Sequence, residues 1–122
     1  MQKSRFRELV ATAIQSIPDE FLRRMENVEI IERERPTEDE LRSAGLDSTD
    51  LLLGLYQGQP LTVRDSYYGN TLPDRILIYQ EPIEAICHND DAIVRQVRKT
   101  VLHEIAHHFG IDDKRLHELG LG

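Results

Sequence analysis

The sequence lacks the features that mark secreted and membrane proteins. It has a single cysteine, Cys87, and no apolar run approaching the roughly 20 residues that a membrane span requires. One cysteine excludes an internal disulfide and agrees with a reducing compartment. We expect Cys87 to be a small buried apolar residue. The first residues also lack the continuous apolar core of a signal peptide, because Arg5, Arg7 and Glu8 interrupt it. These absences predict a cytoplasmic protein with no membrane partner.

The sequence also has no excess of basic residues. Fifteen Lys and Arg residues stand against 22 Asp and Glu residues, which gives a formal net charge of −7. Nucleic-acid affinity depends on cations that neutralise phosphates. We therefore expect no nucleic-acid partner, and only a mild bias against very acidic peptides.

Length and patterning favour one α+β domain. The 122 residues suffice for a single domain over 1–122 and are too few for two ordinary ones. Helical spacing of apolar residues predicts an amphipathic helix over 3–16, and Pro18 opens a second short helix. Three apolar or β-branched runs are predicted as strands: 28–34, 51–56 and 75–80. The last two are expected to pair antiparallel across a long loop, 57–74.

Capping residues mark the later helices. Thr37 and Glu40 form the capping-box pattern of a short helix that stops at Gly45. A cap at position 89 or 90 opens the longest periodic segment, which runs to Phe109. A last short helix is predicted over 113–119.

The most informative stretch is HEIAHHFGIDD, residues 103–113, at the end of the longest predicted helix. It fits H-E-x-x-H-x-x-G-x-x-D, and its first five residues form a zinc-binding helix signature. His103 and His107 are four residues apart, so both imidazoles lie on one face of the helix. Helical geometry turns them away from an apolar stripe made of Val94, Val97, Val101 and Ile105. One side of the helix therefore packs on the core, and the other is left for chemistry.

Gly110 and Asp113 supply the rest of the predicted site. Gly110 accepts a positive φ and ends the helix, so the chain can turn and bring the Asp113 carboxylate to the metal. Asp112 and Glu118 compete as third ligand, although Asp112 is better suited to cap the last helix. Two histidines and one carboxylate leave a fourth zinc position for water, the arrangement of a catalytic site. Glu104, beside the first ligand, is then the general base.

Other polar side chains are weaker candidates. His108 follows a ligand and points about 100° away from it, so it is a packing residue or a support for the metal ligands. His117, four residues after Asp113, is a surface histidine, a residue that supports the site, or a donor to the substrate oxyanion. Four tyrosines are candidates for the same donor role, and spacing selects none of them: Tyr56, Tyr67, Tyr68 and Tyr79.

The motif HEIAHHFGIDD resembles that of the small zincin-like metallopeptidases of bacteria, the minimal-zincin family. Three stretches resemble segments of that family in the same order: LLLGLYQGQPL, LPDRILIYQEPI and VRKTVLHEIAHHFGIDDKRLHELG. The likeness covers residues 50–121 well and the N-terminal third loosely. It implies a compact α+β fold in which a small mixed sheet packs on the active-site helix, with flanking helices. It also implies one zinc ion held by His103, His107 and Asp113, with Glu104 catalytic.

The sequence departs from the related metzincins. They carry histidine at the third-ligand position, where this chain has Asp113, and they have a methionine turn beneath the metal. The methionines here, Met1 and Met25, both lie upstream of the motif.

These features predict a zinc-dependent metallopeptidase that hydrolyses peptide bonds by a zinc-activated water, with Glu104 as general base. A peptide or protein substrate is expected to bind extended along the edge of the strand at 51–56 or 75–80. Zinc is preferred over other divalent metals, although a carboxylate ligand makes the site harder than three histidines would. The alternatives are a non-catalytic zinc- or peptide-binding module on the same scaffold, and an interaction domain without metal.

Overall fold

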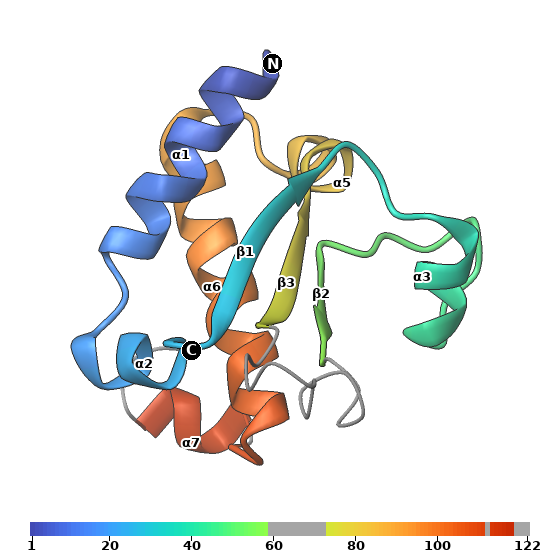
Figure 1. The fold of residues 1–122 in the computed structure, drawn as a ribbon. Helices are drawn as coiled ribbons and strands as arrows, with labels where there is room; N and C mark the ends of the chain where they lie inside the picture. Colours follow the sequence, from blue (N-terminus) through green and yellow to red (C-terminus); the bar gives the residue numbers. More distant parts are fainter. Residues whose placement is uncertain (59–72, 112, 119–122) are drawn as a thin grey trace, which may run out of the picture.

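A three-stranded sheet and a long helix organise the part of the chain that the structure describes. The structure, a computed structural model, describes residues 1–58, 73–111 and 113–118, with residue 113 described in its backbone only. The elements in chain order are α1 (Lys3–Gln15), α2 (Asp19–Arg24), β1 (Val28–Arg33), α3 (Glu38–Ser43), β2 (Gly54–Gln57), β3 (Asp74–Tyr79), α5 (Gln80–Ile86), α6 (Asp90–His108) and α7 (Asp113–Glu118) (Figure 1). The predicted α+β class is confirmed. Most of the segment predicted as a long loop lies outside the described residues.

The sheet is mixed, as predicted. Its order is β1-β3-β2, with β1 parallel to β3 and β2 antiparallel to β3. The expectation that the strand near 75–80 offers an open edge is wrong, because β3 is bonded on both sides. Within the described residues the edges belong to β1 and β2, so β2 is the remaining candidate for an edge that binds peptide.

The strand boundaries differ from the prediction by at most three residues. The strand predicted over 51–56 begins at Gly54, where pairing with β3 starts, and continues to Gln57. Leu51 instead is 55% exposed. Gln80, predicted as the end of a strand, is the first residue of α5. The run of leucines predicted too early a start for β2, because its first residues precede the segment that pairs with β3.

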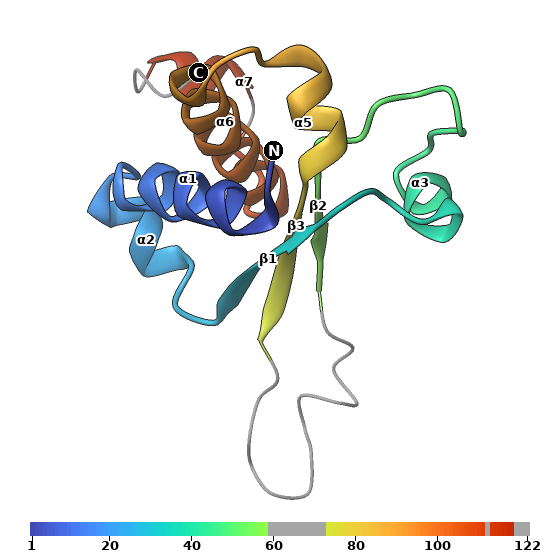
Figure 2. The ribbon, with the colours of Figure 1, turned by 90° about the horizontal axis from the view of Figure 1, so that it is seen from above.

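The apolar face of α6 forms the centre of the core. Val97, Val101 and Ile105 are fully buried, as predicted, and Val94 is half-buried against them. Burying one such side chain stabilises the fold by about 1.5–3 kcal/mol. Figures 1 and 2 show α6 on one face of the sheet with α1 beside it. Cys87 is buried in the same core, and burial raises the pKa of its thiol. The opposite side of α6 is thereby held in a fixed position.

Helix α3 lies beyond β2, on the side of the sheet away from α1 (Figures 1 and 2). Thr37 and Glu40 form the predicted capping box at its start, with Glu40 accepting from the Thr37 N–H at 3.0 Å. The same Glu40 oxygen accepts the Tyr79 hydroxyl at 2.9 Å. One carboxylate thus caps α3 and ties it to the end of β3.

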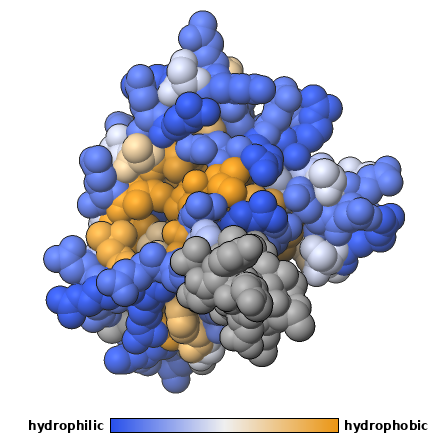
Figure 3. All heavy atoms as spheres, in the orientation of Figure 1, coloured by the Kyte–Doolittle hydropathy of each residue, from blue (hydrophilic) through white to orange (hydrophobic). Residues whose placement is uncertain are grey.

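The face of the molecule drawn in Figure 3 is mostly polar around an apolar area. Figure 3 shows apolar atoms gathered in the middle of one face, where β1 runs in Figure 1. Val28, Ile30 and Ile31 of β1 are half-buried. In the described part of the chain, no helix is both long and apolar enough to cross a lipid bilayer.

Candidate metal centre and active site

The two predicted histidine ligands lie side by side near the end of α6. The centres of the His103 and His107 rings are 4.0 Å apart, with the ring planes at 57°. His103 is half-buried and His107 is exposed. Their four-residue spacing places them one helical turn apart on the face of α6 that the core leaves uncovered.

The chain turns directly after the second histidine. Gly110 has a φ of +75°, in the left-handed region that glycine adopts without steric cost. The Gly110 N–H donates to the His107 carbonyl at 3.3 Å, and the Ile111 N–H to the Ala106 carbonyl at 2.6 Å. These two bonds satisfy the last helical carbonyls in a Schellman motif. The predicted helix stop is therefore confirmed.

Helix α7 returns beside the end of α6. It begins at Asp113, the predicted third ligand, and Leu116 anchors it in the core with 3% of its surface exposed. The Asp113 side chain and all of Asp112 lie outside the described residues, so the choice of Asp113 and the capping role of Asp112 stay predictions. Glu118, a competing ligand, accepts from Arg115 at 3.4 Å. Among the side chains that the structure describes, no group of three His, Cys, Asp or Glu residues is placed to hold a metal ion.

The candidate base, Glu104, is fixed to the sheet. Its Oε1 accepts a hydrogen bond from the backbone N–H of Tyr56 at 3.0 Å. Tyr56 belongs to β2, an edge strand of the described sheet, and its N–H is directed to α6 rather than to β3. This contact places the carboxylate between the edge of β2 and the histidine face of α6.

Strand β2 lies directly against α6 at a second point. A Cβ added to Gly54 would stand 2.6 Å from Cγ2 of Thr100 and 3.0 Å from the Leu77 carbonyl oxygen. Only a glycine fits this close approach, which is one of the two roles that an isolated glycine within an apolar run indicates. Gly54 faces Thr100 and Tyr56 contacts Glu104, so β2 and α6 run side by side in the same direction.

A further cluster, Tyr56–His108–Asp74, adjoins the site and was not predicted. The rings of Tyr56 and His108 stack with centres 4.0 Å apart and planes at 12°. The Tyr56 hydroxyl donates to Asp74 at 2.6 Å, and Asp74 is only 6% exposed. His108 Nε2 lies 3.9 Å from the same carboxylate. His108 therefore packs on the sheet, which agrees with one of its two predicted roles.

The remaining candidates divide by their surroundings. Tyr79 is fully buried and donates to Glu40. Burial, followed by this hydrogen bond and the Glu40 charge, raises the pKa of its hydroxyl well above the usual range. His117 is exposed on α7. Tyr67 and Tyr68 lie outside the described residues. The Tyr79 hydroxyl is therefore bonded to Glu40 of α3 and does not serve as a donor at the site. The identity of the oxyanion donor stays a prediction.

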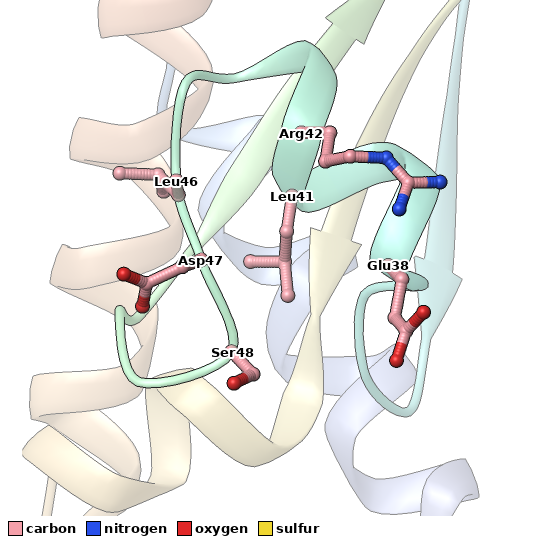
Figure 4. Close-up of a pocket in the computed structure, with 6 residues that line it drawn as sticks. All are labelled: Glu38, Leu41, Arg42, Leu46, Asp47 and Ser48. Carbon is pink, nitrogen blue, oxygen red and sulfur yellow. The ribbon is translucent and has the colours of Figure 1, made fainter.

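An open cavity of about 400 Å³ adjoins the candidate base. It is lined by Leu53, Gly54, Gln96, Lys99, Thr100, His103 and Glu104. A second cavity, of about 230 Å³, lies beside α3 (Figure 4), where Leu41 and Leu46 line it together with Glu38, Arg42, Asp47 and Ser48. Among the described residues the two share no lining side chain, and the first alone contains residues of the zinc motif. The cavity at Glu104 is the one relevant to the predicted chemistry.

The sequence matches a known protein family. A model of the zincin-like metallopeptidases matches residues 25–122. The chain belongs to the zincin-like metallopeptidase family. A solved structure, a conserved hypothetical protein from T. thermophilus, is similar with a TM-score of 0.56 and 25% sequence identity. The alignment covers 89% of this chain and 94% of that one. No curated protein matches the chain.

The donor set of this zincin-like chain fits zinc. Zinc in proteins is bound by imidazole nitrogens and carboxylate oxygens, and catalytic sites use three protein ligands. The structure supplies two adjacent imidazoles on one helix face and a chain turn that brings α7 next to α6. The chemistry of the residues therefore agrees with the metal that the family implies.

Proposed function

We propose that this protein is a zinc-dependent metallopeptidase, with His103, His107 and Asp113 as ligands and Glu104 as general base. The observation that carries the proposal is the position of the Glu104 carboxylate. It is held at 3.0 Å from the Tyr56 N–H, on the strand edge where a peptide would add, and it is adjacent in sequence to His103.

An extended peptide is proposed to bind along β2. An edge strand presents backbone donors and acceptors to which a peptide can add as a further strand. On β2 the Tyr56 N–H already donates to Glu104, so the peptide would pair with the other outward-facing groups of this edge. Such a peptide would run over the histidine face of α6, since β2 lies against that helix at Gly54 and Tyr56. Its scissile carbonyl would then reach the level of Glu104.

The chain's own residues divide the chemistry as follows. His103, His107 and Asp113 would hold the zinc ion, which would supply Lewis acidity to the scissile carbonyl and lower the pKa of a water molecule toward about 7. Glu104 accepts the proton of the attacking water and delivers it to the leaving amine. The Tyr56 N–H orients the carboxylate for both transfers, and the buried side of α6 keeps its distance to the ligands fixed.

Substitution of Glu104 by Gln tests this assignment. Glutamine keeps the shape and can still accept the Tyr56 N–H, but it has no basic carboxylate. General-base catalysis contributes typically about 10²–10⁴-fold, so we expect peptide cleavage to fall by at least that factor while zinc content stays near one ion per chain. Cleavage of a peptide library that survives the substitution would refute the role of Glu104. A zinc-loaded wild-type protein that cleaves no peptide would instead favour a non-catalytic binding module.

A further inference from the structure

A third cavity adjoins the cavity at Glu104 along α6. This third cavity has a volume of about 260 Å³ and is lined by Ile86, Cys87, Ala92, Arg95, Gln96 and Lys99. Gln96 and Lys99 line both cavities. The two cavities adjoin at these residues, and together we call them the Lys99 groove; it extends along α6 from Glu104 to the exposed side chain of Ile86.

Two rows of side chains on α6 form the floor of the Lys99 groove. Arg95, Lys99 and His103 follow one another at four-residue spacing, and the neighbouring row contains Gln96, Thr100 and Glu104. Each four-residue step advances about 6 Å and rotates by only about 40°, so each row runs nearly along the helix. Within the second row, Gln96 donates to Thr100 at 3.1 Å.

The charge of the groove is positive away from Glu104. Lys99 and Arg95 are exposed, and within the described residues neither forms an ion pair, in contrast to Arg5, which pairs with Glu8 and Asp90. Of the side chains that the structure describes, Glu104 alone brings a carboxylate to either cavity. Two cations thus stand in an open groove of a chain whose formal net charge is −7.

The direction of a bound peptide follows from β2. Antiparallel pairing is the more stable and the more frequent arrangement, and β2 runs in the same direction as α6. A peptide antiparallel to β2 therefore passes Glu104 and then reaches Lys99 with residues that follow the scissile bond. Lys99 lies about 6 Å along the helix from His103, which is roughly the length of two extended residues.

We propose that the Lys99 groove makes the site selective for peptides with an acidic side chain about two residues C-terminal to the scissile bond. This inference rests on the proposed function for the position of the scissile bond. Its physical basis is separate, because it needs only Lys99 and Arg95 in the groove beside Glu104.

Binding to the zinc-loaded Glu104→Gln protein tests the proposal without turnover. The probes are labelled peptides of about twelve residues with a neutral first half and a second half that carries either aspartates or lysines. A second pair carries the same charges in the first half. We expect the peptide with aspartates in its second half to bind about fivefold more tightly than its lysine counterpart, as an exposed ion pair allows. The pair with charges in the first half should differ less.

Charge reversal identifies the residue responsible. Lys99→Glu in the Glu104→Gln background should invert the preference, so that the lysine peptide binds more tightly. Arg98→Glu is the matched control: it makes the same charge change one residue away on α6 and lines neither cavity. It should leave the preference unchanged.

Equal affinity for both peptides, or an equal effect of the two charge reversals, would overturn the groove as the selective element. A preference for aspartates in the first half would overturn the proposed peptide direction. Peptide cleavage by the wild-type protein is measured in parallel. Its absence would refute the peptidase function without affecting the binding comparison.

Discussion

Gly110 and Gly45 end two different helices with the same backbone geometry. Both have a φ of +75°, and these are the two positive-φ residues in the described part of the chain. A Cβ on either glycine would meet no atom within 4 Å, so a substitution imposes backbone strain without a clash. They differ in position, because Gly110 lies between the candidate histidines and Asp113, whereas Gly45 ends α3. Substituting each glycine in turn therefore distinguishes an effect on the stability of a helix end from an effect on the geometry of the metal site.

Gly110→Ala and Gly45→Ala should destabilise the protein by similar amounts. A left-handed backbone costs a non-glycine residue about 1–2 kcal/mol, which denaturant unfolding of the metal-free proteins measures. Zinc titration should then show weaker binding for Gly110→Ala alone, because the altered turn moves α7 relative to His107. Zinc affinity that changes equally in both variants would show that the turn at Gly110 does not position a ligand.

Local signals explain why the helix ends were predictable. The cap of α3 uses Thr37 and Glu40, three residues apart, and the turn after α6 depends on one glycine. The sheet order was not predictable in the same way. β3 pairs with β1 across more than forty residues of chain, and nothing in its own sequence indicates which strand lies on each side. Periodicity assigned the strands but not their neighbours.

The candidate site, too, was predictable only where its residues are close in sequence. The spacing of His103 and His107 on one helix placed them together without any tertiary contact. The contact of Glu104 with Tyr56 joins residues 48 positions apart, and the acceptor meets a backbone N–H, which carries no side-chain signal in the sequence. The role of Asp74 beside Tyr56 and His108 was not predicted for a related reason. A single carboxylate just before a strand is typical of a turn. The isolated glycine in an apolar run indicated that the backbone at Gly54 approaches another element closely. Nothing in the sequence indicated that this element is α6 at Thr100.

Gly54→Ala should destabilise the fold and lower activity together. The new Cβ would stand 2.6 Å from Cγ2 of Thr100, a β-branched side chain with little rotamer freedom. Overpacking of this kind costs roughly 1–3 kcal/mol, and relief of the clash moves β2 away from α6 and Tyr56 away from Glu104. Denaturant unfolding and peptide cleavage measure the two effects.

Thr100→Ser provides the compensating change for Gly54→Ala, because it removes the methyl group that the new Cβ would meet. The double variant should recover part of the lost stability, with an interaction energy of about 0.5 kcal/mol or more. Recovery should be incomplete, since the Leu77 carbonyl remains 3.0 Å from the added Cβ. Strict additivity of the two changes would show that Thr100 is not the obstacle.

Tyr79 should make the folded protein lose stability at alkaline pH. Its pKa is raised by burial and by the bond to Glu40, so the folded state holds the proton more tightly than the unfolded state, where the pKa is about 10. The stabilisation is fully present below about pH 10 and is lost as pH rises above that value. Unfolding measured from about pH 7 to 11 should show a steeper alkaline decline for the wild type than for Tyr79→Phe. Parallel curves would contradict the pKa shift.

Zinc should stabilise the folded protein through His103. A ligand present at about 100 times its dissociation constant adds about 2.7 kcal/mol to the free energy of unfolding. We expect zinc to raise the melting temperature, a chelator to reverse the rise, and His103→Ala to abolish it. His88→Ala is the control, because His88 is exposed outside the helices and strands. An equal zinc response in both variants would place the metal elsewhere.

Substitution of the two neighbouring aspartates decides the third ligand. Asp113→Ala removes the carboxylate that opens α7, and Asp112→Ala removes the one before it. If Asp113 binds zinc, its loss should weaken zinc affinity strongly and leave the metal-free protein little changed. Asp112→Ala should then have the smaller effect on zinc affinity. Because α7 stays anchored by buried Leu116 in both variants, a difference between them reports on the carboxylate rather than on the helix. The reverse order of zinc affinities would assign the ligand to Asp112. Near-equal zinc affinities would favour Glu118 as the ligand, and its bond to Arg115 would then have to break.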